Sequence, residues 1–320
     1  MKLIKNTGSK AYLKPLLASL LMLFLAWGCI KETYVLTISV SPEATGIAEE
    51  SGTYEVGETV NLSATANTGY QFAVWAEGDV MVDMESQFAY EMPARNVNLT
   101  AHFFVPGNGV TDIDGNTYPS VIIGQQEWMA GNLRVTRFND GTPIPHLTEG
   151  SDWVQLTTPA YCWFNNDESG HKVTFGALYS WFVTDAQSNG GKNVCPEGWH
   201  VPSDAEWSQM ILHLDPNSNP NNLQESLNAG GKLKEAGFLY WDSPNAGATN
   251  ATGFFGRPGG FRDQGANFVQ MGQLGRWWTA DEHKGFPSSA WWRSIESGSP
   301  RVARHYLLKR QANSIRCIKD

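Results

Sequence analysis

Residues 195–207 read Cys-Pro-Glu-Gly-Trp-His-Val-Pro-Ser-Asp-Ala-Glu-Trp and contain the clearest helix start in the chain. The hydroxyl of Ser203 can accept a hydrogen bond from the N–H of Glu206, whose carboxylate can reach back to the N–H of Ser203. This reciprocal capping box predicts a helix that begins directly after Ser203. One face of that helix would carry apolar residues at helical spacing, namely Trp207, Met210, Ile211 and Leu214. The Pro- and Asn-rich residues 215–220 should end it.

Around this helix, residues 110–320 are rich in glycine and in short aromatic runs, and they hold 11 of the 13 tryptophans. This composition predicts many turns and short strands fixed by large aromatic side chains. We expect a strand and turn over 121–129, and a tight Asp-Gly turn between strands over 112–118. The apolar spacing within 175–186 predicts a second helix.

Residues 34–105 alternate between apolar and polar residues, and helical periodicity is nearly absent. Such alternation predicts half-buried β-strands. The expected strands cover 35–40, 59–66, 71–75, 88–93 and 97–103. The cluster Val-Pro-Gly-Asn-Gly at 105–109 breaks the pattern, which places a domain boundary there with a linker over 106–109.

The N-terminus has the features of a targeting segment. Residues 1–28 contain four lysines and no acidic residue, and their apolar run covers only 16–27. A membrane span needs about 20 apolar residues, so this pattern predicts a secretory signal. Residues 25–29 resemble a lipobox, although Trp27 is bulkier than usual there. We therefore expect cleavage before Cys29, a lipid on its thiol, a lipidated tether over 29–33, and an exported protein anchored at the outer membrane or cell surface. The alternative is an ordinary secreted protein with a free Cys29.

Residues 34–105 resemble the divergent internalin B-type bacterial repeat. The motifs that carry the resemblance lie, in order, at 54–60, 69–75, 92–97 and 99–103. The resemblance implies a small β-grasp-like module that serves as a stalk or spacer on a surface protein.

Residues 110–320 resemble the Fibrobacter succinogenes major paralogous domain. The matching stretches include 112–118, 126–133, 165–168, 195–203, 258–260, 277–278 and 315–317. The family occurs on exported lipoproteins of Bacteroidota and related bacteria. The resemblance implies a C-type-lectin-like or formylglycine-generating-enzyme-like mixed domain, so that the whole chain would be α+β.

Four cysteines are present, at positions 29, 162, 195 and 317. If Cys29 carries lipid, three remain, and bridging is expected in an oxidising compartment. The resemblance implies a Cys195–Cys317 disulfide, which leaves Cys162 as a buried free thiol. Spacing alone leaves pairing of Cys162 with either partner open.

Charge and motifs exclude several functions. Removal of residues 1–28 changes the formal net charge from −9 to −13, a field that repels nucleic acid and anionic lipid. We find no serine-nucleophile elbow, no His-x-x-x-His zinc pair and no phosphate-binding loop. We therefore predict no enzyme and no cofactor. The oxygen-rich residues 112–116 and 165–168 could hold Ca²⁺, but polar turns are the simpler interpretation.

Two adjacent tryptophan pairs are the candidate ligand-binding residues. Neighbouring residues of a strand point to opposite faces, so each pair should send one ring outward, beside an arginine. The residues assigned to the site are Trp278, Trp292, Arg276 and Arg293. The alternative is that all the rings build the core and the arginines stack over them. We predict a non-catalytic module that recognises a glycan or a surface protein. The alternatives are a structural subunit of a surface assembly and a carbohydrate-active enzyme.

Overall fold

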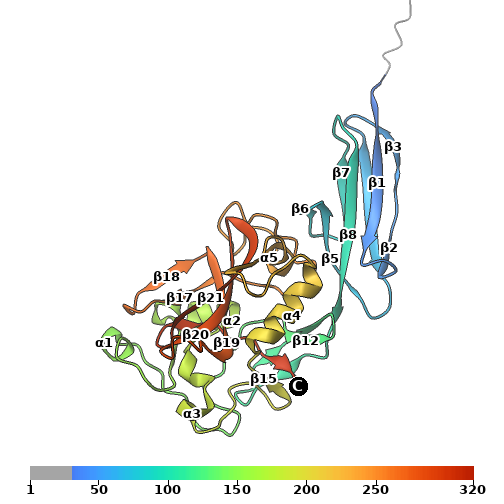
Figure 1. Cartoon of the computed structure of the whole chain (residues 1–320). Helices are drawn as coiled ribbons and strands as arrows, with labels where there is room; N and C mark the ends of the chain where they lie inside the picture. The colour runs from blue at the N-terminus through green and yellow to red at the C-terminus, as the bar shows by residue number, and fades with distance from the viewer. Residues whose placement is uncertain (1–30) are drawn as a thin grey trace, which may run out of the picture.

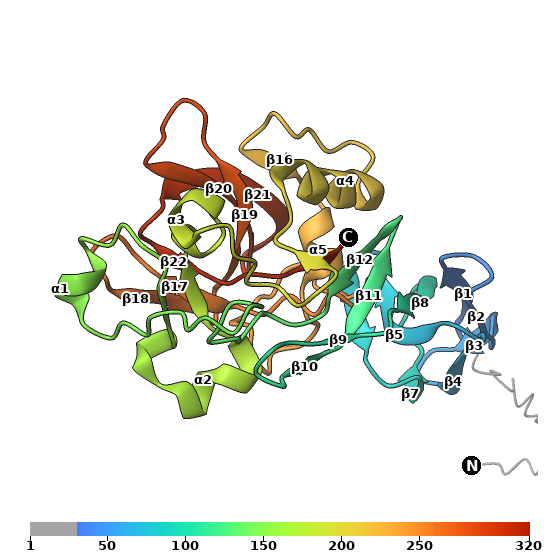
Figure 2. The same ribbon diagram turned by 90° about the horizontal axis from the view of Figure 1, so that it is seen from below.

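The computed structural model describes residues 31–320. Cys29 and the expected signal segment lie outside the described residues. An elongated N-terminal module projects from one side of a larger, rounder C-terminal part (Figures 1 and 2). None of the helices in residues 31–320 has the length and apolarity that crossing a membrane would require.

The N-terminal module is built of strands. They are β1 (Thr33–Ser41), β2 (Gly46–Ala48), β3 (Gly52–Glu55), β4 (Thr59–Ala66), β5 (Gln71–Glu77), β6 (Val80–Asp83), β7 (Gln87–Glu91) and β8 (Val97–Pro106). The five strands predicted from alternation are confirmed as β1, β4, β5, β7 and β8. In β8 every second residue from Val97 to Phe103 is buried, as alternation requires.

Two sheets enclose the core of the module. Strand β8 pairs in parallel with β1 and antiparallel with β5, whereas β4 lies between β2 and β7 in a separate sheet. Leu36, Leu62, Trp75 and Leu99 pack between the two sheets. Because β1 runs parallel to β8, Thr33 lies at the end of the module remote from the C-terminal part (Figure 1).

The sheet continues across the expected domain boundary. Val105 and Pro106, at the end of β8, pair with β11 of the C-terminal part. The N–H of Gly107 donates to the carbonyl of Ser120 at 2.7 Å. The segment 106–109, which we expected to act as a linker, is therefore held by hydrogen bonds to the sheet.

The C-terminal part is β-rich with short helices. Its strands are β9 (Val110–Thr111), β10 (Thr117–Tyr118), β11 (Ser120–Ile123), β12 (Gln126–Met129), β13 (Tyr161–Cys162), β14 (Leu178–Ser180), β15 (Trp199–His200), β16 (Gln224–Ser226), β17 (Gly259–Arg262), β18 (Phe268–Met271), β19 (Leu274–Glu282), β20 (Ser289–Glu296), β21 (Ser299–Leu308), β22 (Ala312–Asn313) and β23 (Ile318–Lys319). Its helices are α1 (Gly150–Trp153), α2 (Glu168–Phe175), α3 (Ala186–Asn189), α4 (Asp204–Leu214) and α5 (Ala229–Leu233), with 3-10 turns η1 (Phe164–Asn166) and η2 (Trp181–Val183). The chain is thus a β-rich α+β protein.

Strand β19 lies between two hydrophobic cores. It ends a four-stranded sheet of order β16-β21-β20-β19. Trp278 belongs to one core together with Tyr179 and Cys195, whereas Trp277 belongs to a second core with Trp207 of α4. Both faces of β19 are therefore buried over residues 275–279.

The helix predicted from the capping box is confirmed. Helix α4 spans Asp204–Leu214, and Ser203 and Glu206 make both capping hydrogen bonds. The helix predicted within 175–186 is wrong. Helix α2 ends at Phe175 because Gly176 adopts a φ of +77°, and the residues that follow form β14 and η2.

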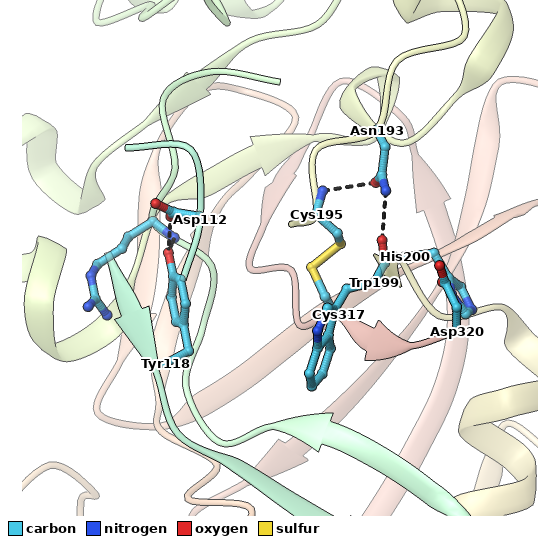
Figure 3. Close-up of a disulfide and its surroundings, with 9 residues drawn as sticks. Asp112, Tyr118, Asn193, Cys195, Trp199, His200, Cys317 and Asp320 are labelled. Atoms are coloured by element: carbon cyan, nitrogen blue, oxygen red, sulfur yellow. Dashed lines mark hydrogen bonds and ion pairs between the residues drawn. A yellow bond between two sulfur atoms is a disulfide. The ribbon is translucent and has the colours of Figure 1, made fainter. Parts of the chain in front are cut away.

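Cys195 and Cys317 form a disulfide across 122 positions of sequence (Figure 3). The Asn193 side chain beside it accepts a hydrogen bond from the N–H of Cys195 at 2.9 Å and donates to the carbonyl of Trp199 at 2.6 Å. This is the pairing that the resemblance implies. Cys162 is a buried free thiol, and burial raises its pKa to about 12.

Candidate functional site

The four residues assigned to the site from the sequence do not form a ligand surface. Trp278 is fully buried, and its indole N–H donates to the carbonyl of Tyr179 at 2.8 Å. Trp292 is 9% exposed and faces the same core. Assignment of these two rings to a ligand is wrong, because β19 has two buried faces and the inward ring of the β20 pair is Trp292.

The two arginines are also structural. Arg276 is buried and donates to Asn313 at 2.6 Å and to Gln311 at 2.8 Å. Its guanidinium lies 3.4 Å from the centre of the Phe261 ring. These polar and aromatic partners replace the water that the cation loses on burial. Arg276 thus ties β19 to the segment that contains β22.

Arg293 lies at the centre of a buried ion-pair network. Its Nε donates to Oε2 of Glu225 at 2.6 Å, and its Nη1 donates to Oδ1 of Asp204 at 2.7 Å. Ser208 of α4 accepts a further bond at 3.0 Å. The network joins α4, β16 and β20, which is a structural role.

Trp291 is the ring that remains available. Of the 12 tryptophans in residues 31–320, it alone falls outside the buried class. It belongs to β20 beside the inward Trp292, so alternation along the strand does turn one ring of this pair outward. It lines a cleft of about 420 Å³ between the start of α4 and the β19–β20 hairpin.

The floor of the cleft is organised by Asp204. Its carboxylate accepts hydrogen bonds from Arg304 at 2.6 and 3.0 Å, in addition to the bond from Arg293. Burial opposes ionisation, but the hydrogen bonds and positive charges of the two arginines outweigh it and hold the pKa of Asp204 below its usual range. The Arg304 guanidinium also lies 3.5 Å from the centre of the Trp291 ring.

An aromatic cluster continues from Trp291 along the hairpin. The ring of His283 lies 4.8 Å from Trp291 and 3.9 Å from Tyr306, centre to centre. Phe286 stacks on Tyr306 at 5.3 Å and is 53% exposed. We call these four residues, Trp291, His283, Tyr306 and Phe286, the hairpin aromatic cluster.

Polar groups beside the cluster can meet a ligand from several directions. Nδ1 of His283 accepts bonds from the N–H groups of Gly285 and Phe286, which leaves Nε2 as the nitrogen that can donate outward. Asp281 accepts a bond from the N–H of Asp204 at 2.6 Å through Oδ2, while its Oδ1 accepts none from the described residues. The site thus combines apolar ring faces with separate donors and acceptors.

The two candidate calcium turns are occupied by protein donors. Asp112 accepts bonds from the N–H groups of Asp114 and Asn116 and from the hydroxyl of Tyr118, so the predicted Asp-Gly turn is confirmed. Asp167 caps α2 through the N–H of Gly170. Within residues 31–320 no three His, Cys, Asp or Glu side chains are grouped closely enough to hold a metal ion.

Sequence reasoning missed most of the real cleft. Trp291 belongs to one of the two adjacent tryptophan pairs in the sequence, but nothing in the sequence marks Asp204 and Arg304 of the cleft, or the neighbouring Tyr306, as members of one site. They lie in different elements, and only the antiparallel pairing of β20 with β21 places Tyr306 opposite Trp291. Neighbouring residues of a strand point to opposite faces, so knowledge that Trp292 points inward would have identified Trp291 as the outward ring.

Comparison with known proteins agrees with the motif analysis. Residues 36–105 match the divergent InlB B-repeat domain, and residues 121–319 match the Fibrobacter succinogenes major domain. Both are surface-type bacterial domains. No curated protein and no solved structure shows a significant match. Since the second match covers more than half of the chain, the protein belongs to the Fibrobacter succinogenes major domain family.

Proposed function

We propose that this chain is a non-catalytic cell-envelope lipoprotein that binds a glycan in the cleft around Trp291. The observation that carries the proposal is the partial exposure of this one tryptophan, when the other 11 in residues 31–320 are buried. The part of the indole that stays exposed can offer an apolar surface to the C–H face of a sugar ring. The donors and acceptors beside it can fix the hydroxyl groups.

The architecture supports a role as an anchored binder. The N-terminus of β1 lies at the far end of the module, so a lipid on Cys29 would hold the cleft away from the membrane. The ten residues of β8 extend about 33 Å at the usual rise of a strand. In this proposal the module is a β-grasp-like spacer, the C-terminal part is lectin-like, and the membrane is contacted through lipid alone.

The carboxylates of the cleft favour binding over hydrolysis. Asp204 is held ionised by two arginines that occupy its oxygens, so it is poorly suited to act as a general acid or base. Glu282 is paired with Lys309. Glycoside hydrolysis needs two carboxyl groups free to exchange protons or attack the sugar.

A glycan array probed with residues 31–320 tests the proposal. We expect selective binding that is lost in Trp291→Ala and partly kept in Trp291→Phe. Phe238→Ala is the matched control, because Phe238 is an exposed aromatic residue (62%) on another loop. Equal binding by the wild type and Trp291→Ala would overturn the assignment of the cleft. Turnover of a bound polysaccharide would instead indicate a carbohydrate-active enzyme.

A second candidate function is that of a structural subunit or adhesin that binds a surface protein. Phe238 and Leu239 are 62% and 80% exposed on the loop after α5, and such neighbouring apolar side chains are typical of protein contacts. A polymeric partner in pull-downs that is lost with Phe238→Ala, and retained with Trp291→Ala, would favour this function.

A further inference from the structure

A second cavity, of about 380 Å³, lies between the N-terminal module and the C-terminal part. One wall comes from β8 of the module, and the other comes from β11, the end of α4 and helix α5. Small-molecule sites are commonly found between domains and have volumes of roughly 300–1,000 Å³. This cavity is separate from the cleft around Trp291, because the two share no lining residue.

The walls are mainly apolar. Phe104 and Val105 contribute from β8, and Ile123 and Leu214 contribute from the C-terminal part. The pairing of Val105 with Ile122 fixes the two walls relative to each other. The cavity is therefore preformed, and a ligand would not have to pull the two parts together.

The charged and imidazole side chains that line the cavity are all basic. Lys232, His102 and His213 all line it, whereas no aspartate or glutamate does. Nζ of Lys232 donates to the carbonyl of Leu214 at 2.7 Å, which leaves two of its three protons for another acceptor. Neither histidine ring makes a hydrogen bond to the described residues. This concentration of donors stands out in a protein whose formal net charge is −9.

The electrostatics favour an anion. Burial and the positive charge of Lys232 lower the pKa of His102, with a small opposing effect from Asp79. Burial, which is the larger cause, and the nearby charge of Lys232 thus both favour the neutral form of the ring. A carboxylate placed there would be attracted by Lys232 and could accept a bond from either imidazole.

We propose that this interdomain cavity binds a small molecule with an apolar body and a single carboxylate. The apolar body packs between Phe104 and Leu214, and the carboxylate lies toward Lys232 and His102. The proposal does not depend on the glycan site, because it rests on a different surface and different residues.

Calorimetric titration of residues 31–320 with decanoate tests this inference, with decan-1-ol as the uncharged analogue of equal length. We expect saturable one-to-one binding of decanoate and at least about tenfold weaker binding of decan-1-ol, as the loss of one favourable charge interaction would give. Equal binding of the two compounds, or no saturable binding of decanoate below about 1 mM, would overturn the proposal.

Three variants locate the site. Lys232→Gln should weaken decanoate binding about tenfold and leave decan-1-ol binding unchanged. Ala251→Phe, which adds a ring to the lining, should weaken the binding of both compounds. Lys172→Gln is the matched control, since Lys172 is a surface lysine of α2 paired with Glu168. If Lys232→Gln lowers stability because its bond to Leu214 is lost, Ala251→Phe still decides the outcome: unchanged decanoate binding in that variant would contradict the assignment.

Discussion

Arg304 stacks over Trp291, 3.5 Å from the ring centre, while its Nε and Nη2 donate hydrogen bonds to the carboxylate of Asp204. Asp204 is the first residue of α4 and follows the capping residue Ser203. The same stretch of sequence that starts the helix therefore also sets the position of Arg304, which packs on the partly exposed Trp291. In this protein the helix start and the candidate ligand cleft are one structural unit.

Arg293→Met should destabilise the protein by about 3–5 kcal/mol, since Glu225 would keep a buried charge without its partner. The side chains of Arg293 and Glu225 are 1% and 0% exposed. Urea denaturation monitored by circular dichroism measures the change. The double variant Arg293→Met/Glu225→Leu should recover part of the loss, and a single-variant loss below about 1 kcal/mol would contradict a central role for the pair.

Replacement of both Cys195 and Cys317 by alanine should cost about 4–5 kcal/mol on the chain-entropy model, because the bond closes a loop across 122 positions. The comparison is made by denaturation without reductant. Cys162→Ala is the control, and it should lose only the packing of one small buried side chain.

In the folded wild type, iodoacetamide at pH 8 should leave Cys162 unmodified, because its buried thiol stays protonated. Rapid labelling would contradict this burial.

His200 should make stability depend on pH. Burial opposes its charge, but hydrogen bonds to Asp320 at 2.6 Å and Glu206 at 2.9 Å outweigh it and raise the pKa of the ring. His200 and Asp320 lie side by side in Figure 3. Because the pKa of the ring is higher in the folded state, protonation of His200 stabilises the fold. This stabilisation is complete below the pKa of about 6.5 in the unfolded chain, and it is lost as the pH rises through the pKa in the folded protein. The stability difference between the wild type and His200→Gln should therefore be larger at pH 6 than at pH 8.5. A difference that grows with pH would show that the carboxylates do not stabilise the imidazolium.

Gly253→Ala should weaken the junction between the two parts. The added Cβ would lie 2.5 Å from the ring of Phe104, at a φ of +68° that alanine rarely adopts. We expect a loss of about 2–4 kcal/mol, from overpacking together with backbone strain. Gly78→Ala is the matched control: its φ is +59° but nothing lies within 4 Å, so only the backbone strain of about 1–2 kcal/mol remains. Thermal denaturation of the wild type should show one transition. If Gly253→Ala and Gly78→Ala lower the free energy of unfolding equally, Phe104 does not join the two parts tightly.

Local signals in the sequence predicted much of the secondary structure. The capping box at Ser203 and the alternating strands of the module were correct because both depend on neighbouring residues. The helix within 175–186 was wrong because its apolar spacing also suits short buried segments, and Gly176 stops the preceding helix. The cleft was missed because strand parity alone cannot show which ring of the Trp291–Trp292 pair on β20 points outward.

Iodide quenching of tryptophan fluorescence tests the central claim, that a glycan covers Trp291. Residues 31–320 lack Trp27, so the quenchable fraction of the emission should come from Trp291 and should disappear in Trp291→Phe. The account predicts that a saturating oligosaccharide, chosen from the array, protects this fraction from iodide in the wild type. If the protein is saturated with that oligosaccharide and the quenchable fraction does not change, the glycan binds elsewhere and the account is contradicted.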